Sequence, residues 1–134
     1  MGNISKSCIE DLDLTIFRVE GALTSDMVMS QLEEFYLDGD PTRHILWDLS
    51  LGEITTITQA EMGRILDLAQ AHAHRRRNGR TALVGSHDLA FGLARMYEIL
   101  AEISDHPLEH RVTRDLDTAL AWITRAPGRK EGEA

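Results

Sequence analysis

The chain has 134 residues, of which 43% are hydrophobic and 27% are charged, and its formal net charge is −8. The length matches a single domain, and the composition is that of a globular protein rather than of a disordered chain. The negative charge disfavours binding to a phosphate backbone or to an anionic membrane surface, so no nucleic-acid partner is expected.

The sequence carries no signal for a membrane or for an oxidising compartment. No apolar run approaches the ~20 residues that span a bilayer, and residues 1–10 lack the apolar core of a secretory signal. Cys8 is the only cysteine, so neither a disulfide within the chain nor a cysteine-based metal cage can form. We therefore expect a cytoplasmic protein with no transmembrane segment and no cofactor.

The first elements are a strand pair and a helix. Residues 12–19 alternate apolar and polar side chains, the period of a half-buried strand, and residues 4–9 form a weaker strand that would pair with it in the antiparallel direction. Thr24 is a candidate N-cap for a helix that ends before the turn formers at residues 38–41. The apolar residues at helical spacing in this segment are Val28, Leu32, Phe35 and Tyr36.

The middle of the chain contains a strand and a capped helix. Residues 44–49 form a nearly continuous apolar run, typical of a strand covered on both faces, and the polar Asp48 falls near its carboxyl end. Thr58 and Glu61 form a capping-box pattern, which predicts a helix start. The predicted inner face of this helix consists of Met62, Ile65, Leu66, Ala69 and Ala73.

The last elements repeat this alternation. Residues 81–85 read as a second buried strand, and Ser86 can cap the helix that follows. Residues 110–114 predict a strand at the sheet edge, and Asp115 begins a final helix. The apolar residues at helical spacing in the helix after Ser86 are Leu89, Leu93, Met96, Leu100 and Ile103, and this stripe is its predicted inner face.

Strands that alternate with helices predict an α/β fold with a mixed, largely parallel sheet of four to five strands and about four helices. Residues 1–125 would form this single domain, and residues 126–134, rich in Gly, Glu, Lys and Arg, a disordered tail. Binding sites in such sheets gather outside the carboxyl ends of the strands. That edge corresponds to residues 48–58 together with the turn at residues 85–87.

Several of these segments together resemble the STAS-like domains of the SpoIIAA-like family. The resemblance rests on residues 20–24, 44–49, 81–85 and 115–123, and it covers almost the whole domain. It implies a non-enzymatic regulatory or protein-interaction module, in the manner of an anti-sigma-factor antagonist. Relatives that have been likened to CRAL-TRIO lipid-binding domains imply a second role, that of a carrier or sensor for a small apolar or lipid-like ligand.

The resemblance does not extend to the phosphorylated serine of the sporulation protein. Its Asp-Ser-Ser-Gly segment aligns with residues 58–61 (Thr-Gln-Ala-Glu), where neither serine is present. The nearby hydroxyls belong to Thr55, Thr56 and Thr58, and Thr58 already has a role as an N-cap. We therefore predict that the phosphoserine switch is not retained, and that a partner binds near Asp48, these threonines, Ser86 and His87.

Catalytic and metal-binding motifs are missing from the sequence. It has no Gly-x-Ser-x-Gly elbow, no Gly-rich phosphate loop followed by Lys, and no Gly-x-Gly-x-x-Gly. His72 and His74 are two residues apart on a helix and so lie on different faces, whereas a helical metal pair needs i, i+4 spacing. A hydrolase built from Asp48, Ser86 and His87 is the weakest alternative, because each of the three has a structural explanation.

Two other groups of residues are candidates for a function. The basic cluster of residues 75–77 and Arg80 lies where a helix should end, and a role in complementing the helix dipole is favoured over phosphate binding. The helix after Ser86 carries more apolar residues than a single buried stripe needs. The candidates for an apolar ligand site or a homodimer surface are Phe91, Met96, Tyr97 and Ile99. The competing explanation is that residues 51–57 fold over this surface.

Overall fold

The structure, a computed structural model, describes residues 2–54 and 57–125. The strands are β1 (Asn3–Ile9), β2 (Leu14–Ala22), β3 (His44–Glu53), β4 (Arg80–Val84) and β5 (Glu109–Thr113). They lie in one sheet in the order β1-β2-β3-β4-β5. β1 is antiparallel to β2, and the remaining neighbours are parallel. The predicted mixed, largely parallel sheet is confirmed, including its antiparallel first strand.

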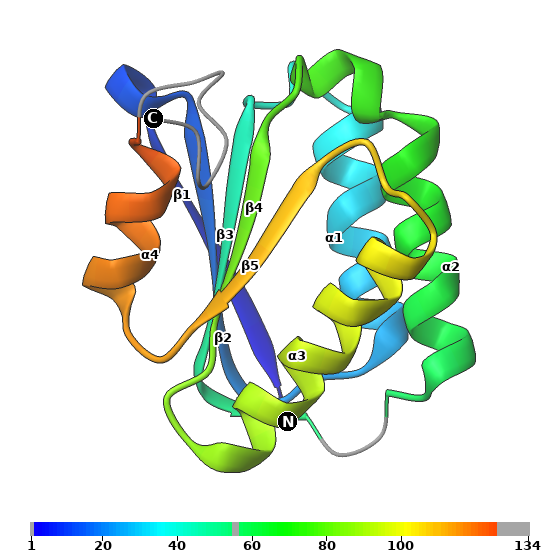
Figure 1. The fold of residues 1–134 in the computed structure, drawn as a ribbon, viewed down its shortest axis with the longest axis vertical. Helices are drawn as coiled ribbons and strands as arrows, with labels where there is room; N and C mark the ends of the chain where they lie inside the picture. Colours follow the sequence, from blue (N-terminus) through cyan, green and yellow to red (C-terminus); the bar gives the residue numbers. More distant parts are fainter. Residues whose placement is uncertain (1, 55–56, 126–134) are drawn as a thin grey trace.

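The helices cover the two faces of the sheet unequally (Figure 1). They are α1 (Ser25–Leu37), α2 (Gln59–Ala71), α3 (Asp88–Ile103) and α4 (Leu116–Ile123), with short 3-10 helices η1 (Glu10–Leu12) and η2 (Ala73–Arg76). Each of α1, α2 and α3 connects adjacent parallel strands, and right-handed crossovers in one direction across the sheet place all three on the same face. α4 lies on the opposite face. None of the helices described is long and apolar enough to cross a membrane.

Side chains that alternate along each strand form two cores. Phe17 and Trp47 belong to the larger core, between the sheet and α1, α2 and α3, and their ring centroids are 4.6 Å apart. Ile16 and Leu46, one residue earlier on the same strands, belong to the smaller core under α4. The near-continuous apolar run of β3 is therefore explained by burial on both faces.

The helix starts follow the sequence signals, with one correction. Thr24 caps α1 by accepting the N–H of Met27, Thr58 and Glu61 form the complete capping box of α2, and Asp115 caps α4. The prediction for α3 was wrong: His87, not Ser86, caps this helix, with Nδ1 accepting the N–H of Ala90 at 3.4 Å. A histidine nitrogen can accept the same hydrogen bond as a serine hydroxyl, but sequence rules for N-caps favour Ser.

The orientation of α3 also differs from the prediction. Its buried apolar positions are the small residues Ala90, Ala94 and Ala101, whereas Leu89, Met96 and Ile103 are exposed. The start of α3 lies close to the sheet: a Cβ at Gly85, just after β4, would be 2.7 Å from the backbone nitrogen of Phe91. Small side chains allow this close approach, so the alanine face packs inward, flanked by Leu93 and Tyr97, whereas Leu89, Met96 and Ile103 point outward.

β3 is longer than predicted, which changes the position of Asp48. The strand continues to Glu53, and its pairing with β2 shifts by one residue between Arg18 and Glu20, as in a β-bulge. Asp48 therefore lies within the strand rather than near its end. The predicted tail, residues 126–134, lies outside the described residues.

Candidate functional site

The carboxyl ends of β2, β3 and β4 form one edge of the molecule, at the bottom of Figure 1, where α1, α2 and α3 begin. Helix starts present backbone N–H groups and the positive end of the helix dipole. The N-terminal residues Gln59 and Ala60 of α2 are exposed, as are Ser86 and His87 before α3. We refer to this region as the carboxyl edge.

A short chain of hydrogen bonds connects two of these helix starts. Ser25 Oγ of α1 donates to Glu61 Oε2 of α2 at 2.6 Å. Glu61 Oε1 accepts the backbone N–H of Thr58 at 2.8 Å, and Thr58 Oγ1 accepts the N–H of Glu61 at 3.2 Å. The hydrogen bond from Ser25, followed by those from Thr58, lowers the pKa of the Glu61 carboxyl, so the carboxylate is held in its charged form. Nothing in the sequence pairs Ser25 with Glu61, 36 residues away.

The remaining residues predicted for a partner site do not converge. Asp48 follows Leu46 by two residues and so faces the α4 side, where its Oδ2 lies 3.3 Å from Arg18 Nε and its Oδ1 accepts the N–H of Ser50. His87 lies in the turn after β4 and caps α3 by accepting the N–H of Ala90. Thr55 and Thr56 lie outside the described residues. The structure thus gives Asp48 and His87 separate partners, and this geometry lends no support to a hydrolase.

An apolar cavity of about 70 Å³ lies beneath the carboxyl edge, between the sheet and the three helices. Its lining includes Trp47 and Leu83 from the strands, Tyr97 and Ala94 from α3, and Ile57 from the segment before α2. A cavity needs at least about 10–15 Å³ to hold one water molecule, whereas sites for drug-sized ligands are roughly 300–1,000 Å³. The cavity has room for a small apolar molecule and is too small for a lipid chain in this conformation.

The four apolar candidates on α3 separate into three environments. Tyr97 lines the cavity, and burial raises the pKa of its hydroxyl, which remains neutral. Met96 and Ile99 are 40% and 39% exposed on the outer side of the helix. Phe91 is partly buried under the guanidinium of Arg114, whose central carbon is 4.0 Å from the ring centroid. A single site or surface does not contain all four.

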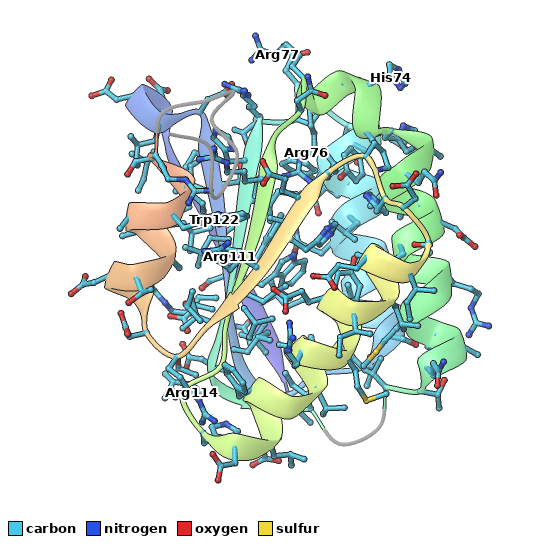
Figure 2. All side chains as sticks on the ribbon, in the orientation of Figure 1. His74, Arg76, Arg77, Arg111, Arg114 and Trp122 are labelled. Atoms are coloured by element: carbon cyan, nitrogen blue, oxygen red, sulfur yellow. The ribbon has the colours of Figure 1, made fainter. Side chains whose placement is uncertain are left out.

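The basic cluster lies at the opposite end of the sheet, which we call the amino edge. Arg76 is 1% exposed, and its guanidinium donates to the carbonyl oxygens of Arg43 and Arg80 and to Thr81 Oγ1. Figure 2 shows Arg76 pointing inward, whereas Arg77 points away from the molecule. The nearby Arg75 also donates to a carbonyl oxygen, that of Gly39, at 3.2 Å. These contacts favour the structural role of the cluster over phosphate binding.

The histidines have local roles rather than a common one. Nδ1 of His44 accepts the N–H of Arg80 at 3.0 Å, and His72 stacks on Tyr36 with ring centroids 5.1 Å apart. Nδ1 of His106 accepts the N–H of Leu108. Residues 2–54 and 57–125 contain no group of three or more His, Cys, Asp or Glu side chains that could hold a metal ion.

Among the solved structures that are similar to this chain, two illustrate the likeness over almost its whole length. One is an uncharacterized protein of the DUF3478 family with a SpoIIAA-like fold from Shewanella loihica PV-4, with a TM-score of 0.56 and 23% identity over 91% of this chain and 93% of that chain. The other is an anti-sigma factor antagonist from Mycobacterium paratuberculosis, with a TM-score of 0.53 and 11% identity over 92% of this chain and 94% of that chain.

No protein-family model matches the chain, and no curated protein matches its sequence. The structural likeness nevertheless covers almost the entire chain. It confirms the SpoIIAA-like, STAS-like fold that the sequence resemblance implied.

Proposed function

We propose that this protein is a non-enzymatic regulatory module that binds a protein partner, as anti-sigma-factor antagonists do, and that the partner contacts the carboxyl edge at the start of α2. The observation that carries the proposal is the structural likeness to an anti-sigma factor antagonist over 92% of the chain. The sequence resemblance aligns the phosphorylated-serine segment of the sporulation protein with residues 58–61, and residues 58–60 are exposed at the start of α2.

The hydrogen-bonded link between the starts of α1 and α2 supports this choice of surface. Thr58 and Glu61 satisfy each other's backbone N–H groups, and Ser25 fixes the second carboxylate oxygen of Glu61. A surface that is held in one conformation before binding loses less conformational entropy when a partner docks. Since residues 59 and 60 carry no hydroxyl, the module would act without the serine switch.

The test is a pair of matched double variants on α2. Gln59→Arg with Ala60→Arg alters the carboxyl edge, and Gln70→Arg with Ala71→Arg makes the same two replacements at the exposed far end of the helix. Both add the same charge, so non-specific electrostatic effects are equal. Proteins captured from cell extract by the native chain should be lost with the first variant and retained with the second. Loss with both variants, or with neither, would contradict this surface.

The cavity favours a second candidate function, the sensing of a small apolar molecule. Ala94 is 3% exposed and lines the cavity, so Ala94→Leu would occupy it. Titration with benzene or xenon, followed by NMR shifts of methyl groups such as Leu83, should show saturable binding to the native protein and none to the variant. If the native protein shows no saturable shifts, the cavity is a packing defect rather than a site.

A further inference from the structure

The outer side of α3 carries an apolar stripe that nothing in the chain covers in the described structure. Among residues 2–54 and 57–125, seven large apolar side chains are at least about a third exposed, and four of them lie on this stripe: Leu89 (53%), Met96 (40%), Ile99 (39%) and Ile103 (76%). We call these four residues, together with the exposed Gly92, the outer stripe. Because the alanine face of α3 is already packed on the sheet, the outer stripe has no role in holding this helix to the sheet.

The spacing of the outer stripe is that of a coiled-coil seam. Positions 89, 92, 96, 99 and 103 follow one another at intervals of three, four, three and four residues, the a and d positions of two heptads. A helix that only covers a sheet needs one apolar face, and in α3 that face is formed by Ala90, Ala94 and Ala101. A second apolar face at heptad spacing, opposite the first, is typical of a helix that packs against another helix.

We propose that this second helix is α3 of another copy of the chain, packed antiparallel across a twofold axis that crosses the outer stripe between Met96 and Ile99. The arrangement is self-complementary, as a twofold contact requires. It places Ile103, the most exposed member, over Gly92 of the partner, and Met96 beside the partner's Ile99. No heavy atom within 4 Å would meet a Cβ at Gly92, so this position offers room for a neighbouring side chain.

The flanking charges are complementary in the same arrangement. Arg95 and Glu102 are seven residues apart and lie on the same side of the outer stripe. Antiparallel pairing brings Arg95 of each copy near Glu102 of the other, so the attraction occurs twice, whereas in a parallel pairing the Arg95 and Glu102 side chains of the two copies would lie on opposite sides of the seam. The side chain of Arg95 is 51% exposed beside its ion pair with Glu98, and Glu102 is exposed.

A contact made by one helix of each copy is small, which predicts a weak dimer. Apolar patches on monomers reach roughly 300–600 Å², so two such patches bury about 600–1,200 Å² in total. Specific interfaces begin at about 1,200 Å², so we expect a dissociation constant on the order of 100 micromolar. This surface is separate from the start of α2, so the dimer proposal does not depend on the proposed function.

The test is sedimentation equilibrium of the full chain from about 10 micromolar to 1 millimolar. The native protein should change from monomer to mostly dimer over this range. Ile103→Lys should remain monomeric with an unchanged unfolding curve, because this side chain is 76% exposed. Leu37→Lys, at a 61% exposed apolar residue on α1, is the matched control and should dimerise like the native protein.

Two further variants test the pairing itself. Gly92→Gln should weaken dimerisation at least tenfold while leaving the monomer as stable or more stable, because it removes a glycine from a helix interior. Glu102→Arg should also weaken it, since like charges would then meet. A native protein that stays monomeric at 1 millimolar would overturn the proposal and leave the outer stripe to a different protein partner. Unaltered dimerisation of Ile103→Lys would overturn it as well.

Discussion

The two ends of the parallel sheet are held together by different kinds of interaction. At the amino edge, the buried guanidinium of Arg76 bonds three groups, and the 5% exposed Arg80 donates to the carbonyl oxygens of Trp122 and Arg125 at the end of α4. At the carboxyl edge, exposed caps such as Thr58 satisfy the helix starts locally. Buried hydrogen bonds thus stabilise one end of the sheet, whereas the hydrogen bonds at the other end are exposed or only partly buried.

This difference separates stability from binding. A residue whose hydrogen bonds are buried and reach across the chain cannot be replaced without leaving other polar groups unsatisfied. Exposed caps can be changed at a cost of about 0.5–2 kcal/mol each, so the surface around them can vary while the fold persists. Substitutions at the amino edge should therefore affect folding, and substitutions at the carboxyl edge mainly recognition.

The largest expected effect is that of Arg76→Ala. The change leaves the carbonyl oxygens of Arg43 and Arg80 and the hydroxyl of Thr81 without their donor, and it opens a cavity. We expect a loss of about 3–5 kcal/mol in the free energy of unfolding, measured by urea denaturation. Arg77→Ala is the matched control, because the Arg77 side chain is 71% exposed and pairs with Asp13 at the surface. The free energy of unfolding of Arg77→Ala should be lower than that of the native protein by less than about 1 kcal/mol. Equal losses would show that the amino edge is not held by buried bonds.

The next effect concerns the close approach of α3 to β4. In Gly85→Ala, the new Cβ would lie 2.7 Å from the nitrogen and 2.8 Å from the Cα of Phe91, and both are backbone atoms. Since the helix would have to move, we expect a loss of roughly 1–3 kcal/mol. Gly63→Ala in α2, where no heavy atom lies within 4 Å of a Cβ, should instead raise stability by about 0.5–1 kcal/mol. Thermal unfolding of both variants compares their stabilities with that of the native protein. Unchanged stability in Gly85→Ala would mean that α3 can move away from β4 without cost.

The amino edge should also respond to pH through His44. Burial, followed by the positive charges of Arg43, Arg76 and Arg80, lowers the pKa of His44 to about 4. The unfolded chain takes up this proton near pH 6.5, so stability is lost as the pH falls from about 6.5 toward 4. The slope contributed by one such histidine approaches about 1.4 kcal/mol per pH unit. The Asn oxygen in His44→Asn can still accept the N–H of Arg80. In this variant the free energy of unfolding should change less between pH 6.5 and 5 than in the native protein. An unchanged slope would assign the acid sensitivity to other groups.

Much of the fold could be predicted from local sequence patterns. The alternation in β2, the apolar run of β3 and the capping signals at Thr24, Thr58 and Asp115 each depend on residues close together in the chain. Such signals indicate which segments form strands or helices and where these elements begin. The order of the elements then leaves few right-handed arrangements of the sheet.

The orientation of α3 could not be predicted in this way. Two apolar stripes share this helix, and the larger residues, Leu89, Met96 and Ile103, indicated the wrong inner face. What decides the orientation is the distance between helix and sheet, which depends on Gly85 and on the small volume of Ala90 and Ala94. Long-range contacts such as Ser25 to Glu61 are equally invisible in the sequence, since no local pattern connects them.

The smallest expected effect tests that contact at the carboxyl edge. Ser25→Ala removes the hydrogen bond to Glu61 Oε2, while Thr58 continues to donate to the other carboxylate oxygen. Because the hydrogen bond from Ser25 is the main cause of the lowered pKa of Glu61, this pKa should rise toward its ordinary value, as followed by NMR titration of the carboxyl. Asp115 is an internal control, since bonds from Thr118 lower its pKa and the variant leaves them intact.

The stability change in Ser25→Ala should be below about 1 kcal/mol, because the bond is partly exposed and water can replace the serine hydroxyl. Ser30→Ala, at an exposed serine on α1, should change neither the pKa of Glu61 nor the stability beyond a few tenths of a kcal/mol. An unchanged Glu61 pKa in Ser25→Ala would show that the starts of α1 and α2 are not joined in solution. The start of α2 would then be held in one conformation only after the partner binds.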